Sequence, residues 1–346
     1  MGILRIILAL SVIVAHVGPL FGLQFFGNGV MAVETFYMLS GFYMALVISI
    51  RYHGRIRDFY FNRFLRLFPI YWILVLIFFV FGTLYRIFVG NSLGALAVWR
   101  ECHDPLLWIW GCISNLTMVG ADWAQLYGHL TNRNGEGVNG LIAIQPIWSV
   151  SVEIVFYLAV PFVIRLSKFA QIVVFLGAIA LRAIIWALGG HQWTLWLYYF
   201  APATWVFFMG GVLAYHSMTW FEKHGWFNRF GVSIGRILAC LLVLQIVFYS
   251  GNKLLHFQDW RYYAAVWCSL PFVFSAFKNS FIDGAFASLS YPIYLAHYVI
   301  ISLYSPLRHF VPPQATIYAV VFLSFLLCLV VLRFDASIQS RFKRIV

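Results

Sequence analysis

The chain has 346 residues, of which 63% are hydrophobic, 20% aromatic and only 10% charged, and its mean hydropathy is +0.86. A water-soluble globular fold cannot hide so much apolar surface, so the composition excludes that class. The formal net charge of +12 does not indicate nucleic-acid binding, because the basic side chains stand between apolar segments rather than on one amphipathic face.

Apolar segments of membrane-spanning length follow one another along the chain. The hydrocarbon core of a bilayer requires about 20 mostly apolar residues per helix. The first segment lacks a small-x-small cleavage pattern, so we interpret it as a helix of the mature protein. The segments predict an all-α, polytopic transmembrane helical bundle of about ten helices in a single domain of residues 1–346. In chain order they lie at about residues 3–23, 30–50, 69–89, 148–166, 170–188, 197–215, 232–250, 262–277, 286–304 and 315–333.

The distribution of Lys and Arg predicts the topology. Most of the 23 basic residues fall in alternate connecting segments, which the positive-inside rule places in the cytoplasm together with both termini. The tail charges Lys343 and Arg344 belong to this cytoplasmic set. The charges assigned to the outer side or to helix ends include Arg133, Arg182, Lys253 and Arg308.

The longest interruption covers about residues 90–147 and falls on the extracytoplasmic side. It contains several tryptophans and glycines, including Gly135. We expect interfacial or re-entrant pieces here that shape an acceptor site, although an interfacial aromatic belt is the more ordinary explanation of the tryptophans.

Arg5 and His16 are ionisable side chains in the first apolar segment. Placing such groups inside a membrane costs free energy, so they are candidates for function. At about 100° and 1.5 Å per residue, eleven positions return to almost the same side of a helix, about 16 Å further along it. One stripe therefore carries both groups. The alternatives are a snorkelling topology anchor for Arg5 and a core histidine for His16.

Glu34 lies in the second segment, at a depth comparable with that of His16 if the two helices form a hairpin. A carboxylate there would orient the imidazole and stabilise its charged form while the ring removes a hydroxyl proton. An interfacial carboxylate wetted by the headgroups is the alternative. Ser40 and Gly41, later in the same segment, favour close helix packing.

Arg63 and Arg66 lie one helical turn apart in the predicted cytoplasmic loop that follows the second helix. Two guanidinium groups at this spacing suit a phosphate-bearing ligand. The pair is therefore a candidate phosphate clamp, and a positive cluster that binds anionic lipid is the alternative.

Two later segments carry further polar groups. Ser149, Glu153 and Tyr157 follow i, i+4 spacing and line one helix face, either as a substrate-orienting set or as a hydrogen-bond network for packing. Tyr294 and His297 are i, i+3 neighbours after Pro292, which we expect to loosen the helix.

Metal binding is not predicted, because the chain has no HExxH motif and no compact set of ligands. Its five cysteines show no CxxC spacing. Cys102 and Cys112 share the outer loop and would pair if that side is oxidising; otherwise they are packing residues.

Taken together, these motifs resemble the acyltransferase-3 family of membrane acyltransferases, in the stand-alone form without a fused hydrolase-like domain. Many members carry aspartate at the position of Glu34. The motifs that carry the resemblance occur in the family's order: Arg5 with His16; Glu34 to Gly41; Arg63 with Arg66; Trp148, Ser149, Glu153, Phe156 and Tyr157; and Ser290, Tyr294, Leu295 and His297.

The resemblance implies acyl-CoA as a co-substrate, with acetyl as the default acyl group because it is common in the family. Arg63 and Arg66 would hold the CoA phosphates at the cytoplasmic mouth, Arg5 would line the donor channel, and His16 would act as general base on an acceptor hydroxyl. The remaining polar residues would orient the substrate. An acyl-enzyme intermediate stays open.

The expected acceptor is a hydroxyl of an extracytoplasmic glycan, polysaccharide or glycolipid, and the expected location is a bacterial cytoplasmic (inner) membrane. No permanently bound cofactor, no metal and no nucleic acid are expected, and membrane lipids are the surroundings. The alternatives are a transporter or flippase of an anionic amphiphile and a lipid-binding scaffold without catalysis.

Overall fold

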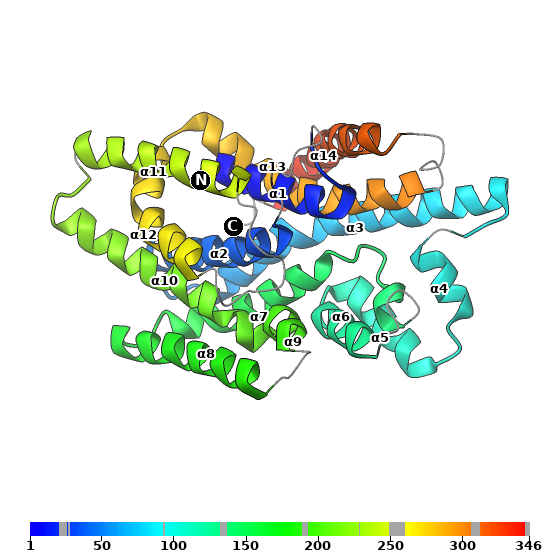
Figure 1. Cartoon of the computed structure of the whole chain (residues 1–346), viewed down its shortest axis with the longest axis horizontal. Helices are drawn as coiled ribbons and strands as arrows, with labels where there is room; N and C mark the ends of the chain where they lie inside the picture. The colour runs from blue at the N-terminus through cyan, green and yellow to red at the C-terminus, as the bar shows by residue number, and fades with distance from the viewer. Residues whose placement is uncertain are drawn as a thin grey trace. The chain divides into compact units, whose positions relative to one another are not determined.

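The computed structural model describes residues 1–20, 26, 28–92, 94–131, 137–188, 193–227, 229–248, 260–305 and 312–342. Within these ranges the chain is helical and contains no β-strand, which confirms the all-α prediction (Figure 1). One 3-10 helix, η1, spans Val138–Leu141. The α-helices are α1 (Gly2–Val17), α2 (Gly29–Ile50), α3 (Ile56–Val89), α4 (Ala95–Glu101), α5 (Pro105–Thr117), α6 (Ala121–Leu130), α7 (Ile147–Val163), α8 (Lys168–Leu188), α9 (Trp193–Tyr199), α10 (Ala201–Lys223), α11 (Arg229–Phe248), α12 (Trp260–Phe277), α13 (Phe281–Tyr304) and α14 (Pro313–Phe342).

In the part of the chain that the structure describes, six helices are long and apolar enough to cross a membrane: α2, α3, α8, α11, α13 and α14. Two shorter apolar helices, α1 and α7, accompany them. Many of their apolar side chains are exposed on the surface of the protein, as expected where lipid is the solvent. The chain is therefore an integral membrane protein, and the number of about ten spans and the side of each terminus stay predictions.

Helix boundaries differ from the sequence expectation in several places. Helix α1 ends at Val17, well before residue 23. Helix α3 begins at Ile56, so the segment with Arg63 and Arg66 is helical rather than a loop. Pro292 lies inside α13, which continues to Tyr304. Residue 20 is followed by a stretch, 21–25, outside the described residues.

Some predicted positions cannot be compared with the structure. They lie outside the described residues, and they are Arg133, Gly135, Lys253, Arg308, Lys343 and Arg344.

The helices group into two compact units that alternate along the chain. The first unit contains Met1–Ile56, Phe156–Tyr198 and Pro202–Tyr291. The second contains Arg57–Val155, Tyr199–Ala201 and Pro292–Val346. The chain passes from one unit to the other inside α7 and inside α13, and each unit is described below by itself.

In the first unit, small residues bring helix backbones close together. A Cβ added to Gly41 of α2 would lie 1.9 Å from the carbonyl oxygen of Phe208 in α10. The reverse contact is equally tight, because a Cβ on Gly211 of α10 would lie 2.0 Å from the carbonyl oxygen of Met38. Gly41 therefore has the packing role that the sequence indicated.

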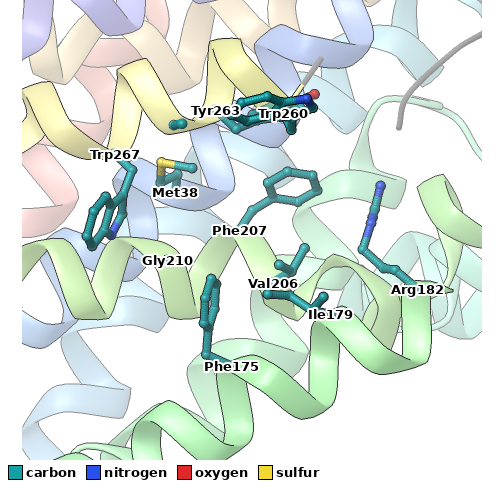
Figure 2. A pocket seen from close by; sticks show the side chains of 11 residues that line it. Met38, Phe175, Ile179, Arg182, Val206, Phe207, Gly210, Trp260, Tyr263 and Trp267 are labelled. Atoms are coloured by element: carbon teal, nitrogen blue, oxygen red, sulfur yellow. The ribbon is translucent and has the colours of Figure 1, made fainter. Parts of the chain in front are cut away.

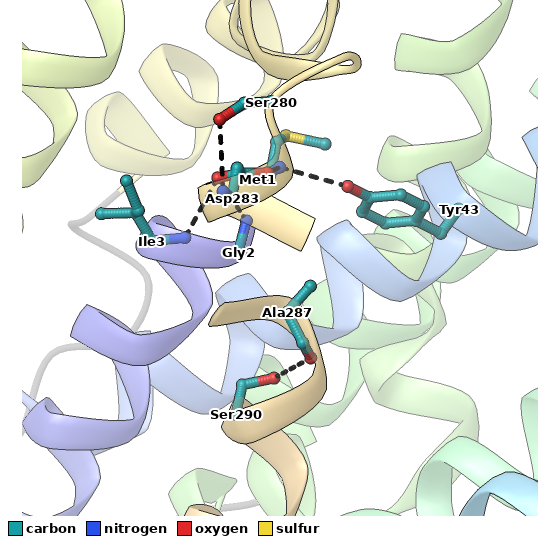
Figure 3. Close-up of polar contacts among 8 residues, drawn as sticks. All are labelled: Met1, Gly2, Ile3, Tyr43, Ser280, Asp283, Ala287 and Ser290. Atoms are coloured by element: carbon teal, nitrogen blue, oxygen red, sulfur yellow. Dashed lines mark hydrogen bonds and ion pairs between the residues drawn. The ribbon is translucent and has the colours of Figure 1, made fainter. Parts of the chain in front are cut away.

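The start of α1 is held by an acidic side chain from the start of α13 (Figure 3). The Oδ1 atom of Asp283 accepts hydrogen bonds from the backbone N–H groups of Gly2, at 2.7 Å, and Ile3, at 3.1 Å. The Met1 amino group pairs with the Oδ2 atom of the same carboxylate. The first turn of a helix has unpaired N–H groups and a partial positive charge, so a carboxylate is a favourable cap.

In the second unit, the segment after α3 folds back as α4, α5, α6 and η1. The hydroxyl of Tyr71 donates to the carbonyl of Asn115 at 2.9 Å, and the indole of Trp72 donates to the carbonyl of Leu116 at 3.0 Å. The side-chain amide of Asn115 donates to the carbonyl of Leu141 at 2.8 Å. The described part of the predicted outer loop is therefore a helical layer tied to α3.

Candidate functional site

Ser149 of α7 and Tyr294 of α13, from two separate sequence motifs, meet in the second unit. Their hydroxyl oxygens are 2.7 Å apart, and both side chains are buried. The carbonyl of Pro146 lies 3.0 Å from the Ser149 hydroxyl and 3.3 Å from that of Tyr294. Each hydroxyl can donate only one proton. The arrangement of hydrogen bonds with the shortest distances therefore has Tyr294 donating to Ser149 and Ser149 donating to the carbonyl of Pro146.

His297 and Glu153 lie beside this pair of hydroxyls. The imidazole of His297 is fully buried, and its ring centroid is 5.9 Å from that of Tyr294. Glu153 stands one turn after Ser149 on α7 and is close enough to interact electrostatically with Tyr294. Four of the predicted orienting residues therefore form one polar cluster, which we call the α7–α13 cluster: Ser149, Glu153, Tyr294 and His297.

Tyr157, the fifth predicted orienting residue, is buried two turns after Ser149 on the same helix. At this spacing it lies on the same face of α7 as Ser149, and its orienting role stays a prediction. It belongs to the portion of α7 that packs in the first unit.

Tyr199 and His129, which the motifs did not indicate, extend the polar chemistry of the second unit. The ring of Tyr199 in α9 stacks on His129 of α6, and its hydroxyl lies 3.1 Å from His129 Nε2. Trp148 packs edge-on against the same tyrosine ring at 4.7 Å. Burial lowers the pKa of His129, so the neutral ring can accept a hydrogen bond from the tyrosine hydroxyl. No sequence spacing links these positions.

In the first unit, Glu34 of α2 is almost completely buried, with 1% of its surface exposed. Its Oε1 atom lies 3.5 Å from the Arg182 guanidinium of α8, and its Oε2 atom accepts a hydrogen bond from the Tyr263 hydroxyl of α12. These recorded partners are different from His16, the partner that the sequence predicted. The role of Glu34 in orienting an imidazole stays a prediction.

Arg182 is the principal site residue that sequence reasoning assigned differently. The charge distribution places it on the outer side or at a helix end, and the structure shows it buried within α8. One guanidinium nitrogen donates to the carbonyls of Leu197, at 3.1 Å, and Ala203, at 3.2 Å, and the group stacks over the Phe207 ring at 4.8 Å. Its position inside an apolar segment was a signal for a functional role.

Arg5 and His16 share α1, as predicted, but differ in their surroundings. Arg5 is buried, with its guanidinium 4.7 Å from the centroid of the Tyr43 ring in α2. This cation–π contact stabilises a charge held away from water. His16 lies in the last turn of α1, and its side chain is exposed.

Arg63 and Arg66 lie three residues apart on α3, so both extend from one side of a regular helix. Both are half-buried, and the Arg63 guanidinium lies 5.8 Å from the Phe59 ring centroid. This spacing is compatible with two guanidinium groups on one phosphate.

Within the described residues there is no group of three or more His, Cys, Asp and Glu side chains that would hold a metal ion. Cys102 and Cys112 are both free thiols, so the disulfide considered for the outer segment is not formed in the structure.

The fold and these clusters define a helical integral membrane protein with ionisable and hydroxyl side chains buried between its apolar helices. A family model described as an acyltransferase domain matches residues 1–333. The chain belongs to the acyltransferase-3 family, and it is an acyltransferase. Neither a curated protein nor a solved structure gave a significant match.

Proposed function

We propose that this protein transfers an acyl group, with acetyl as the default, from cytoplasmic acyl-CoA to a hydroxyl of an extracytoplasmic glycan, polysaccharide or glycolipid. The observation that carries the proposal is the family match over residues 1–333, which includes every motif described above. The proposed location is a bacterial inner membrane, with both termini in the cytoplasm.

In the proposed reaction His16 takes the proton from the acceptor hydroxyl, and the oxygen attacks the thioester carbonyl. A carbon–oxygen bond forms and the carbon–sulfur bond breaks. The thiolate of CoA leaves and receives the proton from the imidazolium, so the products are an ester and free CoA. The exposure of His16 at the end of α1 supports this role, because a substrate can reach the ring.

The donor phosphates are too polar to enter an apolar bundle, so we assign them to Arg63 and Arg66 on α3. Arg5, buried against Tyr43, supplies a positive charge along the donor path. The α7–α13 cluster supplies hydroxyl and imidazole groups that orient a hydroxylated substrate.

The test compares wild type with His16→Ala and with His224→Ala as a matched control. His224 is exposed, and its ring contacts the carbonyl of Trp220 on its own helix. Each protein is purified, checked for equal monodispersity and supplied with acetyl-CoA and an extract of surface glycans while thiol release is followed.

We expect acceptor-dependent thiol release to fall by about 100-fold or more in His16→Ala, the range typical of a lost general base, and to persist in His224→Ala. Equal release by His16→Ala and wild type would show that His16 is not the base. A transporter of an anionic amphiphile would show no acceptor-dependent release from any of the three proteins.

A further inference from the structure

A cavity of about 410 Å³ lies in the first unit, between α2, α8, α10 and α12 (Figure 2). Its walls are mainly apolar and aromatic, and they include Met38, Phe175, Phe207 and Trp267. Ligand-binding cavities for small molecules have about this size, and an apolar cavity of only ~150 Å³ already binds benzene. The space is therefore sufficient for several methylene groups of a hydrocarbon chain.

One end of this cavity is polar. Arg182 and Tyr263 belong to its lining, and both contact the buried carboxylate of Glu34. A guanidinium group has five N–H donors. Within the described residues two of them are used in hydrogen bonds, to the carbonyls of Leu197 and Ala203, while Glu34 is an ion-pair partner at 3.5 Å. Donor capacity therefore remains at the polar end for a ligand.

The cavity also reaches the outer surface of the helices. Ile179 of α8 is 40% exposed and Trp260 of α12 is 64% exposed, and both belong to the lining. Helix α8 is a candidate membrane span, and most of its apolar side chains are on the surface. In a bilayer these side chains face lipid, so a hydrocarbon chain can enter without crossing water.

We propose that this cavity binds the hydrocarbon chain of a membrane amphiphile, with a neutral, hydroxylated head placed at Arg182, Tyr263 and Glu34. The charges of Arg182 and Glu34 balance each other, so a further buried charge has no counterion there. A hydroxyl can instead accept from Arg182 and donate to Glu34. The proposal concerns binding alone and holds whether or not the chain transfers acyl groups.

Gly210 of α10 offers a way to fill the cavity. A Cβ at this position would lie 3.8 Å from Met38 Cε, 3.8 Å from Phe175 Cε2 and 3.9 Å from Trp267 Cδ1. These are ordinary contact distances, so a larger side chain projects into the cavity without a backbone clash. Gly177 of α8 has no heavy atom within 4 Å of its added Cβ, so Gly177→Leu is the matched control.

The probe is a dodecyl glucoside that carries a photoreactive diazirine at the end of its chain, bound to protein in phosphatidylcholine nanodiscs without an acyl donor. We expect saturable crosslinking to peptides from α8, α10 or α12 in wild type and in Gly177→Leu. Gly210→Leu should weaken binding by about tenfold or more, because the leucine displaces several methylenes of the chain. Gly210→Ala and Gly210→Val should give smaller, graded losses of probe binding. They replace the leucine variant in the test if that variant does not fold.

Competition distinguishes the head groups. Unlabelled dodecyl glucoside should displace the probe at lower concentration than dodecyl phosphate of the same chain length. Equal or better competition by the phosphate would overturn the assignment of a neutral head. Crosslinking that is not saturable, that maps to other helices, or that is unchanged across the Gly210 series would overturn the cavity as the binding site.

Discussion

In the first unit, the buried carboxylate of Glu34 has a cation, Arg182, and a tyrosine hydroxyl as partners. In the second unit, the buried carboxylate of Asp122 has a serine hydroxyl instead: Ser151 donates to its Oδ1 atom at 2.8 Å. Both carboxylates have 2% or less of their surface exposed. They therefore differ in the charge of the partner rather than in burial.

This difference predicts different responses to mutation. A buried ion pair is sensitive to the loss of one partner, because the other charge is then left without a counterion in a medium of low polarity. A carboxylate that is bonded to a hydroxyl can lose its charge by protonation and keep its hydrogen bond. The first unit should therefore respond most strongly to side-chain replacement, and the second to pH.

The largest expected effect is on the ion pair in the first unit. Glu34→Gln and Arg182→Gln each leave one buried charge unpaired, so each should lower the free energy of unfolding by about 3–5 kcal/mol. The double variant should lose less than the sum of the two, because it leaves neither charge. Thermal and denaturant unfolding of the four purified proteins, measured in one detergent, gives the double-mutant cycle.

The control for this cycle is the exposed pair of Lys278 and Glu222, which lie 3.3 Å apart with 39% and 56% of their side chains exposed. Lys278→Gln should change the stability by less than about 1 kcal/mol, since exposed pairs contribute little. Single variants of Glu34 and Arg182 that are as stable as wild type would contradict the assignment of a buried ion pair.

Much of the fold could be predicted from the sequence, because a membrane-spanning helix needs only a local run of apolar residues. The segments predicted at 30–50 and 170–188, for example, agree with α2 and α8 within a few residues. The start of α3 was missed because Arg, Asp and Asn interrupt its first turns, and hydropathy does not detect a polar helix.

The residues of the α7–α13 cluster could be predicted from the sequence because they occur in pairs with helical spacing. Ser149 and Glu153 are four residues apart, and Tyr294 and His297 three. The contacts of Arg182 with Glu34, and of Tyr199 with His129, join residues that are far apart in the chain. Such contacts depend on which helices pack together, and no local pattern in the sequence contains that information.

A smaller effect is expected in the α7–α13 cluster, where Tyr294→Phe removes one hydroxyl and no charge. The variant should lose about 1 kcal/mol of stability, because Ser149 loses a partner at 2.7 Å while its bond to Pro146 remains. If the cluster orients the acceptor, kcat for acyl transfer should fall more than this loss of stability explains. Differential scanning and steady-state assays give the two quantities.

Tyr127→Phe is the matched control for Tyr294→Phe, because Tyr127 is 40% exposed and contacts Trp110 through its ring. It should change neither stability nor kcat. A Tyr294→Phe variant that is less stable but transfers acyl groups at the wild-type rate would assign the cluster to helix packing, the alternative that the sequence left open.

The last expected effect, that of Asp122→Asn, should depend on pH rather than have one fixed size. Burial raises the pKa of Asp122 above its ordinary value of 3.8, whereas the hydrogen bond from Ser151 acts in the opposite direction. Between 3.8 and the raised pKa the folded state therefore holds more protons than the unfolded state. Linkage then requires that the stability contributed by Asp122 falls as the pH rises through this window.

Asparagine keeps an oxygen that accepts from Ser151 and does not titrate. The stability of Asp122→Asn relative to wild type should therefore increase as the pH rises from about 4 to 7, by up to about 1.4 kcal/mol for each unit by which the pKa is raised. Ser151→Ala is the complementary variant, since loss of its hydrogen bond should raise the pKa of Asp122 further and extend the window to higher pH. Melting temperatures measured across this pH range test both. A constant difference between Asp122→Asn and wild type would mean that this carboxylate ionises as freely as an exposed one, and that the second unit tolerates buried charge without a cation.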